Sequence, residues 1–540
     1  MIRKVPVPTL RSLGFGVLSL VRAAMAPLGW RQSEARSVRQ AARQPTASPR
    51  RLGHPAGIAV SALLLGPGLS GCILGTERPD LNLDVPAAYR EGGRRAPDAH
   101  VPALDWWRGF RSRELTALMD TAQIYNLDIA VAIAQIVQAD AQVGVAGAPL
   151  LPSATGTATA EQARTAAGSA VSGGTVFSRT FSQYSLGLTA SYMIDVWGKN
   201  RATLFAAEES ATASRYNREV VTLTAIVTVA NTYFQVLAAQ DQLRVARRNL
   251  AAAQRILSLI KDQYAGGTAS QLEVSQQEAL VSTERAAIPP LEITLRQNIA
   301  ALAVLVGRAP ANFTVNGGML TQIAVPRVTP GMPSELLNQR PDIRQAEAQL
   351  VASNFSVEAA RAAFFPQIQL TAQTGVQSAA LASLFGPGAW FYTLTAGLTQ
   401  PIFDGFLLES QLKQAKGVQL QNLQAYRKAV LSAFADVEKA LVALSQSTLQ
   451  ERLQSEAVTN SRRAFEVSET QLRAGTVNLI TVLQTQQTLL IAENTLAQVR
   501  LTKLLAASSL FQALGGGWTP TGELSSLQPQ DNPASPRPTN

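Results

Sequence analysis

The residue types that carry most enzyme chemistry are scarce in this chain of 540 residues. There are two histidines, His54 and His100, and both precede the first segment with a regular pattern. The sequence has no Gly-x-Ser-x-Gly elbow, no phosphate-binding loop and no His or Cys cluster with the spacing of metal ligands. We therefore expect no catalysis, no bound metal and no cofactor.

The single cysteine, Cys72, is a candidate for covalent modification. It follows Leu69-Ser70-Gly71 at the end of a short apolar stretch that begins after two arginines, and this order describes a secretory signal. The ending resembles a bacterial lipobox, whose cysteine becomes the lipidated first residue of the mature chain. We predict lipidation of Cys72, and Ile73 in place of an aspartate favours sorting to the outer membrane. Because the signal starts about fifty residues after Met1, we expect the true translation start to lie downstream of Met1.

The net charge of +10 does not indicate a nucleic-acid partner. Residues 1–71 contain ten basic residues and one acidic residue, so this segment alone carries +9. The remainder has 37 basic and 36 acidic residues. No basic stripe for phosphate contacts is implied for the body of the protein.

The chain contains two copies of one unit of about 200 residues. Matching residues recur at an offset of 214 near the start of each copy and of 208 further on, which places a deletion between Pro366 and Gly405. Each copy is predicted to run helix, strand, loop, strand, very long helix, tight turn, helix. The pairs that define the repeat are Asp128 and Asp342, Pro152 and Pro366, Gly267 and Gly475, Thr268 and Thr476, and Gly307 and Gly515.

Apolar and polar residues alternate in the predicted strands, best over 184–194 and 392–402. Each run is about ten residues long, as a tilted strand crossing a bilayer requires. A soluble sheet with one wet face shows the same alternation. Four strands cannot close a barrel, so membrane entry requires eight strands from a dimer or twelve from a trimer. No run of 18 apolar residues follows position 80, so we expect no membrane-spanning helix.

The remainder of each copy is predicted to form long helices. No proline interrupts the segment between Gly198 and Gly267, and its apolar residues recur at heptad spacing. The Gly-Thr turns fold the following segments back as antiparallel hairpins. Pro289-Pro290 must kink or end the first returning arm, whereas the second copy has no proline there.

These residues together resemble the TolC-like outer-membrane efflux factors of the OprM/NodT lipoprotein type. The resemblance implies an α+β membrane protein: a homotrimer whose four strands per chain form a twelve-stranded outer-membrane barrel above a periplasmic helical barrel of coiled-coil hairpins. It also implies a periplasmic adaptor and an inner-membrane RND transporter as partners, with outer-membrane lipid around the barrel. The likeness runs from about Trp106 to Trp518 and rests on Asp105-Trp106-Trp107, Asp195-Val196-Trp197-Gly198, Ile288-Pro289-Pro290-Leu291-Glu292, Arg340-Pro341-Asp342-Ile343, Phe364-Phe365-Pro366 and Leu514-Gly515-Gly516-Gly517-Trp518.

Within this family the hairpin tips meet the adaptor and close the tunnel, so the resemblance assigns tip contacts to Gly267, Thr268, Gly475 and Thr476. Relatives narrow the pore with a hydrophobic residue, an aspartate and an arginine. The corresponding positions here are Ile480, Gln484 and Gln487, so the charges are missing. We therefore expect a gate held by apolar contact and amide hydrogen bonds, less sensitive to pH and divalent ions. Solvated positions on a helix surface are the alternative for the two glutamines.

The expected function is passive export of drugs or other toxic small molecules through a tripartite pump. A non-conducting periplasmic coiled-coil scaffold lipoprotein and a type I protein-secretion exit duct are the alternatives. The predicted divisions are a signal and N-terminal extension (1–71), a lipid-anchored segment (72–110), repeat 1 (111–307), a Pro-rich linker (308–333), repeat 2 (334–517) and a disordered tail (518–540).

Overall fold

The computed structural model describes residues 79–81, 83, 85–86, 88–90, 103–164, 180–328 and 331–518. All of them belong to one compact unit. Cys72, the signal that precedes it and residues 519–540 of the predicted tail lie outside the described residues.

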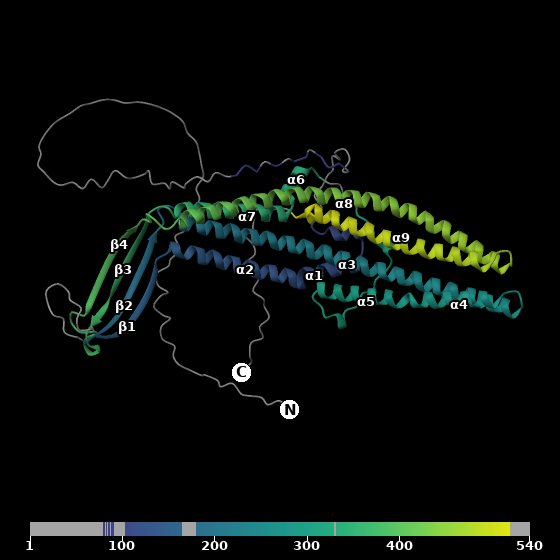
Figure 1. Cartoon of the computed structure of the whole chain (residues 1–540), viewed down its shortest axis with the longest axis horizontal. Coiled ribbons are helices and arrows are strands. Elements are labelled where there is room, and N and C mark those ends of the chain that lie inside the picture. Colours follow the sequence, from purple (N-terminus) through teal and green to yellow (C-terminus); the bar gives the residue numbers. More distant parts are fainter. Residues whose placement is uncertain are drawn as a thin grey trace, which may run out of the picture. The chain divides into compact units, whose positions relative to one another are not determined.

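Both halves of the chain contain the same series of elements (Figure 1). Helices lead into two strands, a very long helix follows, and a tight turn leads into a returning arm. Short 3-10 helices lie at Trp106–Phe110, Ala148–Leu150, Pro310–Asn312, Leu320–Gln322, Leu381–Ser383 and Gly515–Gly517. The main elements are α1 (Arg113–Tyr125), α2 (Leu127–Gly147), β1 (Ser153–Arg164), β2 (Thr180–Ile194), α3 (Lys199–Ala265), α4 (Gln271–Ala286), α5 (Ile288–Leu305), α6 (Pro333–Gln339), α7 (Pro341–Ala362), β3 (Gln367–Ser378), β4 (Trp390–Thr399), α8 (Leu407–Arg473) and α9 (Leu479–Ala513).

The first strands and the long helices of the two copies match in length and spacing. Strands β1 and β3 each have 12 residues and begin at Ser153 and Gln367, which are 214 positions apart. Helices α3 and α8 each have 67 residues and begin at Lys199 and Leu407, 208 positions apart. The two offsets found in the sequence therefore correspond to equivalent elements of the structure.

The four strands form one antiparallel sheet in the order β1-β2-β3-β4. The alternating pattern located the strands, but the predicted run over 392–402 extends too far. Strand β4 ends at Thr399, and Ile402 lies beyond it with 91% of its surface exposed. Pro401 explains the difference, because proline has no N–H to continue a ladder.

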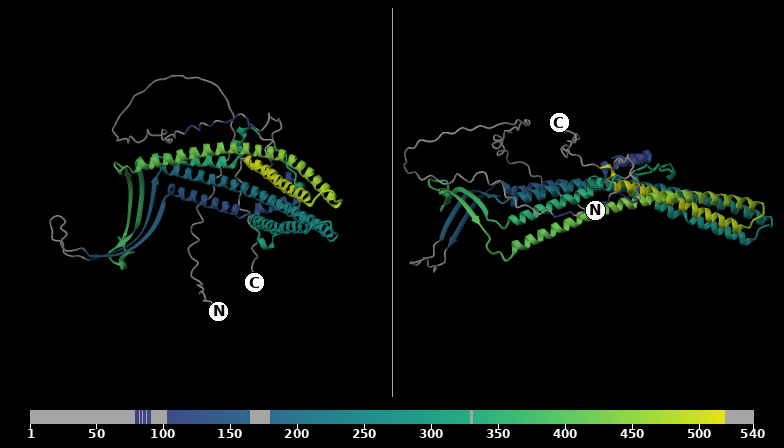
Figure 2. Two further views of the ribbon diagram at one scale, coloured as in Figure 1. Left: turned by 45° about the vertical axis from the view of Figure 1, so that its right-hand side comes forward. Right: turned by 90° about the horizontal axis from the view of Figure 1, so that it is seen from above.

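Helices α3 and α8 run from the sheet to the two hairpin turns (Figures 1 and 2). At 1.5 Å per residue, 67 helical residues span about 100 Å. Helix α2 packs against α3, and α7 packs between α3 and α8, in the half next to the sheet. Helices α4, α5 and α9 pack against the far half. The long helices are thus supported by side-to-side packing along their length.

The returning arms of the two hairpins differ, as the proline pattern predicted. The first arm is broken at Ala287 into α4 and α5, and Pro289 and Pro290 lie in the first turn of α5, where their missing N–H groups cost nothing. The second arm is the single 35-residue helix α9.

The expectation that no helix could span a membrane is wrong by length and composition. The segment Arg113–Leu150 and helix α3 each contain a window long and apolar enough to do so. In α3 half of that window is buried inside the protein, which is the usual state of a core helix. In the first segment 11% is buried, so much of the apolar surface of α2 is uncovered in one chain.

Side-chain contacts at the strand–helix junction join the two copies. The Trp197 indole N–H donates to the Pro366 carbonyl at 2.8 Å, and its ring stacks on Phe365 with centroids 4.8 Å apart. The Asp195 carboxylate accepts from the backbone N–H groups of Asn200 and Arg201, two of the unpaired donors at the start of α3. The junction therefore fixes the start of α3 against the strand start of the other copy.

The Arg340-Pro341-Asp342 motif joins the start of α7 to the end of α9. The Arg340 side chain donates to the Asp342 carboxylate and, at 3.2 Å, to the Ala513 carbonyl at the end of α9. It also contacts Asp436 of α8 at 3.5 Å. Arg340 is 9% exposed, so this charge is buried and is matched by carboxylates and a helix C-terminus.

Replacing Gly515 by alanine should destabilise this junction by about 2–4 kcal/mol. Gly515 has φ +84°, and an added Cβ would lie 2.1 Å from the Gln339 carbonyl oxygen. The matched control is Gly405→Ala, because Gly405 also has positive φ but has nothing within 4 Å of the added atom. Chemical denaturation in detergent should show the larger loss for Gly515→Ala, and equal losses would contradict the close contact.

Candidate functional site

Strand register gives the sheet one apolar face. Tyr192 pairs with Leu370 and Leu370 with Ala396, and side chains at directly paired positions lie on the same side. We call this surface the apolar face; its main residues are Ala154, Gly156, Ala158, Ala160, Tyr184, Leu186, Leu188, Ala190, Tyr192, Ile194, Ile368, Leu370, Ala372, Thr374, Val376, Trp390, Tyr392, Leu394, Ala396 and Leu398. At the end of the strands away from the helices, the same side also carries Gln162, Arg164, Thr180, Ser182 and Ser378.

The opposite surface carries hydroxyls and carboxamides, and we call it the polar face. Its described positions include one carboxylate, Glu161, near the end of β1, and no basic residue. Its hydroxyl and amide residues are Ser153, Thr155, Thr157, Thr159, Gln183, Ser185, Thr189, Ser191, Gln367, Gln369, Thr371, Gln373, Gln377, Thr393, Thr395 and Thr399.

The apolar face is uncovered in the single chain, where 75% of Leu394 and 66% of Trp390 are exposed. In water such a surface marks an interaction or membrane site. Strands β1 and β4 are the two ends of the sheet, so each has one edge without a partner strand among the described residues. Backbone groups at such edges must be satisfied before the sheet can enter lipid.

The two hairpin tips have the same local geometry. Gly267 and Gly475 take φ +75° and +69°, which glycine adopts without strain. The Thr268 backbone N–H and hydroxyl both donate to the Gln263 carbonyl, at 2.8 and 3.0 Å. Thr476 makes the same two bonds to Gln471 at 2.9 and 3.1 Å. These bonds close the ends of α3 and α8 and explain why both turns need a Gly-Thr pair.

The three predicted gate residues lie on one exposed face of α9. Ile480 is 62% exposed, and Gln484 and Gln487 follow at helical spacing on the same side. Ile491, 58% exposed, continues the series. We call Ile480, Gln484, Gln487, Ile491 and Gln498 the exposed stripe. The opposite side of α9 is buried in a cluster with α3 and α8 that includes Val482 and Leu489.

The buried side of α9 contains polar contacts that the sequence analysis missed. Glu493, 9% exposed, binds Arg462 of α8 and lies 3.8 Å from Arg248 of α3. Two turns nearer the tip, the Gln486 side chain donates to the Asn249 carbonyl of α3 at 3.4 Å. Glu493 is the one acidic residue in α9, and a single acid in an otherwise uncharged stretch could have indicated a buried ion pair. These contacts fasten the second hairpin to the first.

A charged residue is also buried on α4. Glu284 is 7% exposed, and burial raises the pKa of its carboxyl above the usual value. Glu284 therefore ionises less readily than a solvated glutamate. It lies on α4 and is not part of the exposed stripe of α9.

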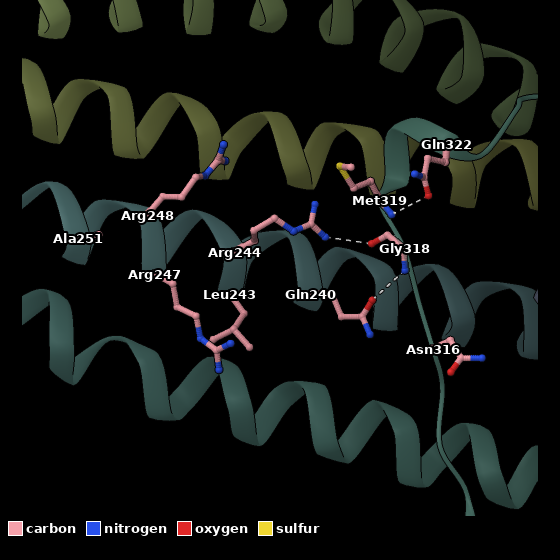
Figure 3. A pocket seen from close by; sticks show the side chains of 10 residues that line it. All are labelled: Gln240, Leu243, Arg244, Arg247, Arg248, Ala251, Asn316, Gly318, Met319 and Gln322. Atoms are coloured by element: carbon pink, nitrogen blue, oxygen red, sulfur yellow. Dashed lines mark hydrogen bonds between the residues drawn. The ribbon is translucent and has the colours of Figure 1, made fainter.

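Side chains of α1 and α3 fasten the segment between the repeats across α3, and Figure 3 shows those that come from α3. Glu114 accepts from the backbone N–H groups of Asn316 and Gly317 at 2.8 and 3.0 Å. Gln240 accepts from the Gly318 N–H, and Arg244 donates to the Gly318 carbonyl at 3.0 Å. The predicted linker is thus held by its backbone, which a sequence pattern does not reveal.

Neighbouring arginines on α3 point away from each other beside this segment. Arg247 reaches Glu292 of α5, and Arg248 turns toward α9 (Figure 3). Among the residues that the structure describes, no three His, Cys, Asp or Glu side chains form a group that could hold a metal ion.

Strands long enough to cross a bilayer, one lipid-type face and long helical hairpins define a class: outer-membrane proteins with an extended helical body. The family model described as "Outer membrane efflux protein" matches residues 118–308 and 332–516. The chain belongs to the outer membrane efflux protein family.

Individual relatives agree with this assignment. The chain is 37% identical over 458 residues to the pyoverdine export outer membrane protein OpmQ of Pseudomonas aeruginosa, covering 83% of this chain and 96% of that protein. It is 31% identical over 411 residues to the toluene efflux pump outer membrane protein TtgI of Pseudomonas putida, covering 76% and 87%. The open-state MtrE outer membrane channel of Neisseria gonorrhoeae superposes with TM-score 0.69 at 28% identity, covering 82% and 98%. The predicted resemblance, outer-membrane location and efflux function are confirmed.

Proposed function

We propose that three copies of this chain close a twelve-stranded barrel in the outer membrane, continued by a tunnel of helical hairpins in the periplasm. The observation that carries the proposal is the four-stranded sheet, which has one apolar face, one polar face and two edges that no other described strand pairs with. Pairing β4 of one copy with β1 of the next satisfies both edges, and the apolar face then meets lipid. The uncovered apolar surface of α2 becomes available for contact between copies.

The tunnel passes small toxic molecules from a periplasmic adaptor and an inner-membrane RND transporter to the exterior. The tips at Gly267-Thr268 and Gly475-Thr476 are the proposed adaptor contacts, because their matching geometry offers two similar docking elements per chain. The relatives named for pyoverdine export and for toluene efflux supply two cargo classes to test first.

The deciding experiment is the oligomeric mass of the protein extracted from isolated outer membranes. Light scattering in detergent, with the micelle mass subtracted, should give three chains. A membrane-embedded dimer would replace the twelve-stranded barrel by an eight-stranded one. A monomer in the soluble periplasm would favour the scaffold lipoprotein.

Lipidated Cys72 is the proposed second attachment to the membrane. Arg427 of α8 donates to the carbonyls of Asp80 and Leu81, both at 2.9 Å, which fastens the segment that follows Cys72. Eight residues from Cys72 to Asp80 span at most about 29 Å. Arg427 lies 20 residues into α8, about 30 Å from the sheet end of that helix. A fully extended tether therefore ends close to the sheet end of α8, and the lipid attached to Cys72 would extend beyond it.

Replacing Cys72 by alanine should abolish incorporation of radiolabelled palmitate, because no other thiol exists to accept the lipid. Ser70→Ala is the matched control, since it keeps a small residue before the cleavage site. Label retained in Cys72→Ala would show that the lipid is attached elsewhere or that the signal has been misread.

The proposed gate comprises the rings that three copies of Ile480, Gln484 and Gln487 would form near the tips. Carboxylate rings attract divalent cations and titrate, and carboxamides do neither. We expect magnesium at millimolar concentration to change single-channel conductance by less than about a fifth. Strong divalent block that disappears in Gln484→Ala would contradict an uncharged gate.

A further inference from the structure

We propose that the export path of this protein is lined at both ends by carboxamides and hydroxyls, and that it passes hydrogen-bonding solutes with little preference for the sign of their charge. The inference deepens the proposed function and rests on it, because the polar face and the exposed stripe line a path only in the closed trimer. It specifies the cargo class: polar, amide- or hydroxyl-rich molecules that are neutral, zwitterionic, cationic or anionic.

The polar face supports this at the membrane end. Four glutamines on β3 (Gln367, Gln369, Gln373 and Gln377) share this face with threonines and serines of all four strands. Glu161 is its one charged residue among the described strand positions, and it lies near the end of β1 that leads into the loop. The central part of the face therefore offers donors and acceptors without a fixed charge.

The arrangement of charges on α9 supports it at the tip end. The helix contains three charged residues, Glu493, Arg500 and Lys503, and each is paired with a residue of α8. Glu493 binds Arg462, while Arg500 and Lys503 both bind Glu451, at 3.1 and 2.9 Å. All three charges are thus engaged between helices, and the exposed stripe carries amides between aliphatic residues.

The physical consequence concerns selectivity. A ring of like charges in a narrow pore concentrates counter-ions and excludes ions of its own sign. A carboxamide both donates and accepts, so it can replace water around carbonyls, amines or carboxylates alike. Three copies of Gln484 and Gln487 at the narrowest part would then impose size and wettability, without choosing a charge sign.

The test is the reversal potential of single trimers in planar bilayers under a potassium chloride gradient. The wild type should show a potassium-to-chloride permeability ratio within about twofold of one. Gln484→Asp should shift the ratio several-fold toward potassium, and Gln484→Lys should shift it toward chloride. Gln484→Asn is the matched neutral control and should leave the ratio unchanged.

The possible outcomes distinguish failure of this inference from failure of the proposed function as an export duct. A strongly cation-selective wild type, or aspartate and lysine variants with the same ratio as wild type, would overturn the inference and leave the duct intact. Absence of current from all four proteins would contradict the duct itself.

A thiol probe tests the membrane end independently. With Cys72 lipidated, Thr371→Cys on the polar face supplies the one free thiol, and Ala372→Cys places it on the apolar face. Cationic and anionic methanethiosulfonate reagents should modify Thr371→Cys at equal rates after correction for their intrinsic reactivities, and Ala372→Cys should resist both. A tenfold preference for the cationic reagent at Thr371→Cys would overturn the proposed lining.

Discussion

Arginine in place of Leu394 is expected to keep the protein from assembling in the outer membrane, whereas arginine in place of the next residue, Thr395, should be tolerated. Leu394 lies on the apolar face near the middle of β4, and 75% of it is exposed in the single chain. An arginine facing lipid at the midplane costs about 2–4 kcal/mol, and the proposed trimer would carry three of them. Thr395 lies on the polar face, where water can hydrate the guanidinium.

The measurement is the amount of heat-modifiable trimer in isolated outer membranes, compared at equal synthesis. We expect Leu394→Arg to lower it at least tenfold and Thr395→Arg to lower it less than twofold. Similar yields from the two variants would mean that the apolar face does not meet lipid. The opposite order would mean that the faces are reversed.

The second large effect is expected from Arg340→Leu, which should destabilise the protein by about 3–5 kcal/mol. The substitution removes the buried guanidinium that binds Asp342, approaches Asp436 and donates to the Ala513 carbonyl. Asp342 would lose its partner, and the carbonyl at the end of α9 would lose a donor.

Arg344→Leu is the matched control, because Arg344 lies one turn further along α7 and pairs with Glu347 near the surface. Its side chain is 27% exposed, compared with 11% for Arg340, so the loss should be about 1 kcal/mol or less. Denaturation in detergent measures both variants. Equal losses would show that the Arg340 cluster contributes no more than an ordinary ion pair.

Much of this fold could be predicted because the sequence contains two copies of one unit with matching residues at nearly constant spacing. Matching pairs such as Gly267 and Gly475 revealed the duplication, and period-two alternation located the strands. The absence of proline between Gly198 and Gly267 predicted a single helix, and α3 occupies that interval. Pro289 correctly marked the broken arm, because a proline inside a helix removes a hydrogen bond.

The contacts that hold the elements together could not be predicted in this way. The segment at Gly318 is bound through backbone atoms, which any residue supplies. The partner of Glu493 is 31 residues away on α8, and no periodicity connects the two positions. The end of β4 was misplaced because Ile402 continues the alternation after Pro401 has already ended the ladder. For the site itself, the family resemblance supplied Ile480, Gln484 and Gln487, and the structure places all three exposed along one side of α9.

Because α3 and α8 are so long, a small rotation at the strand–helix junction produces a large displacement at the hairpin tips. Both helices follow a residue with positive φ: Gly198 at +79°, shortly after β2 ends at Ile194, and Phe406 at +66°, in the segment after β4 ends at Thr399. For a rigid rod of about 100 Å, a rotation of about 5° at that pivot displaces the tip by roughly 9 Å. A small rotation beside the packed rings of Trp197 and Phe365 would therefore move the tip, and with it the proposed gate, by several ångströms. The stiffness of the junction, as much as the chemistry of the tips, would therefore determine how wide the proposed periplasmic entrance opens.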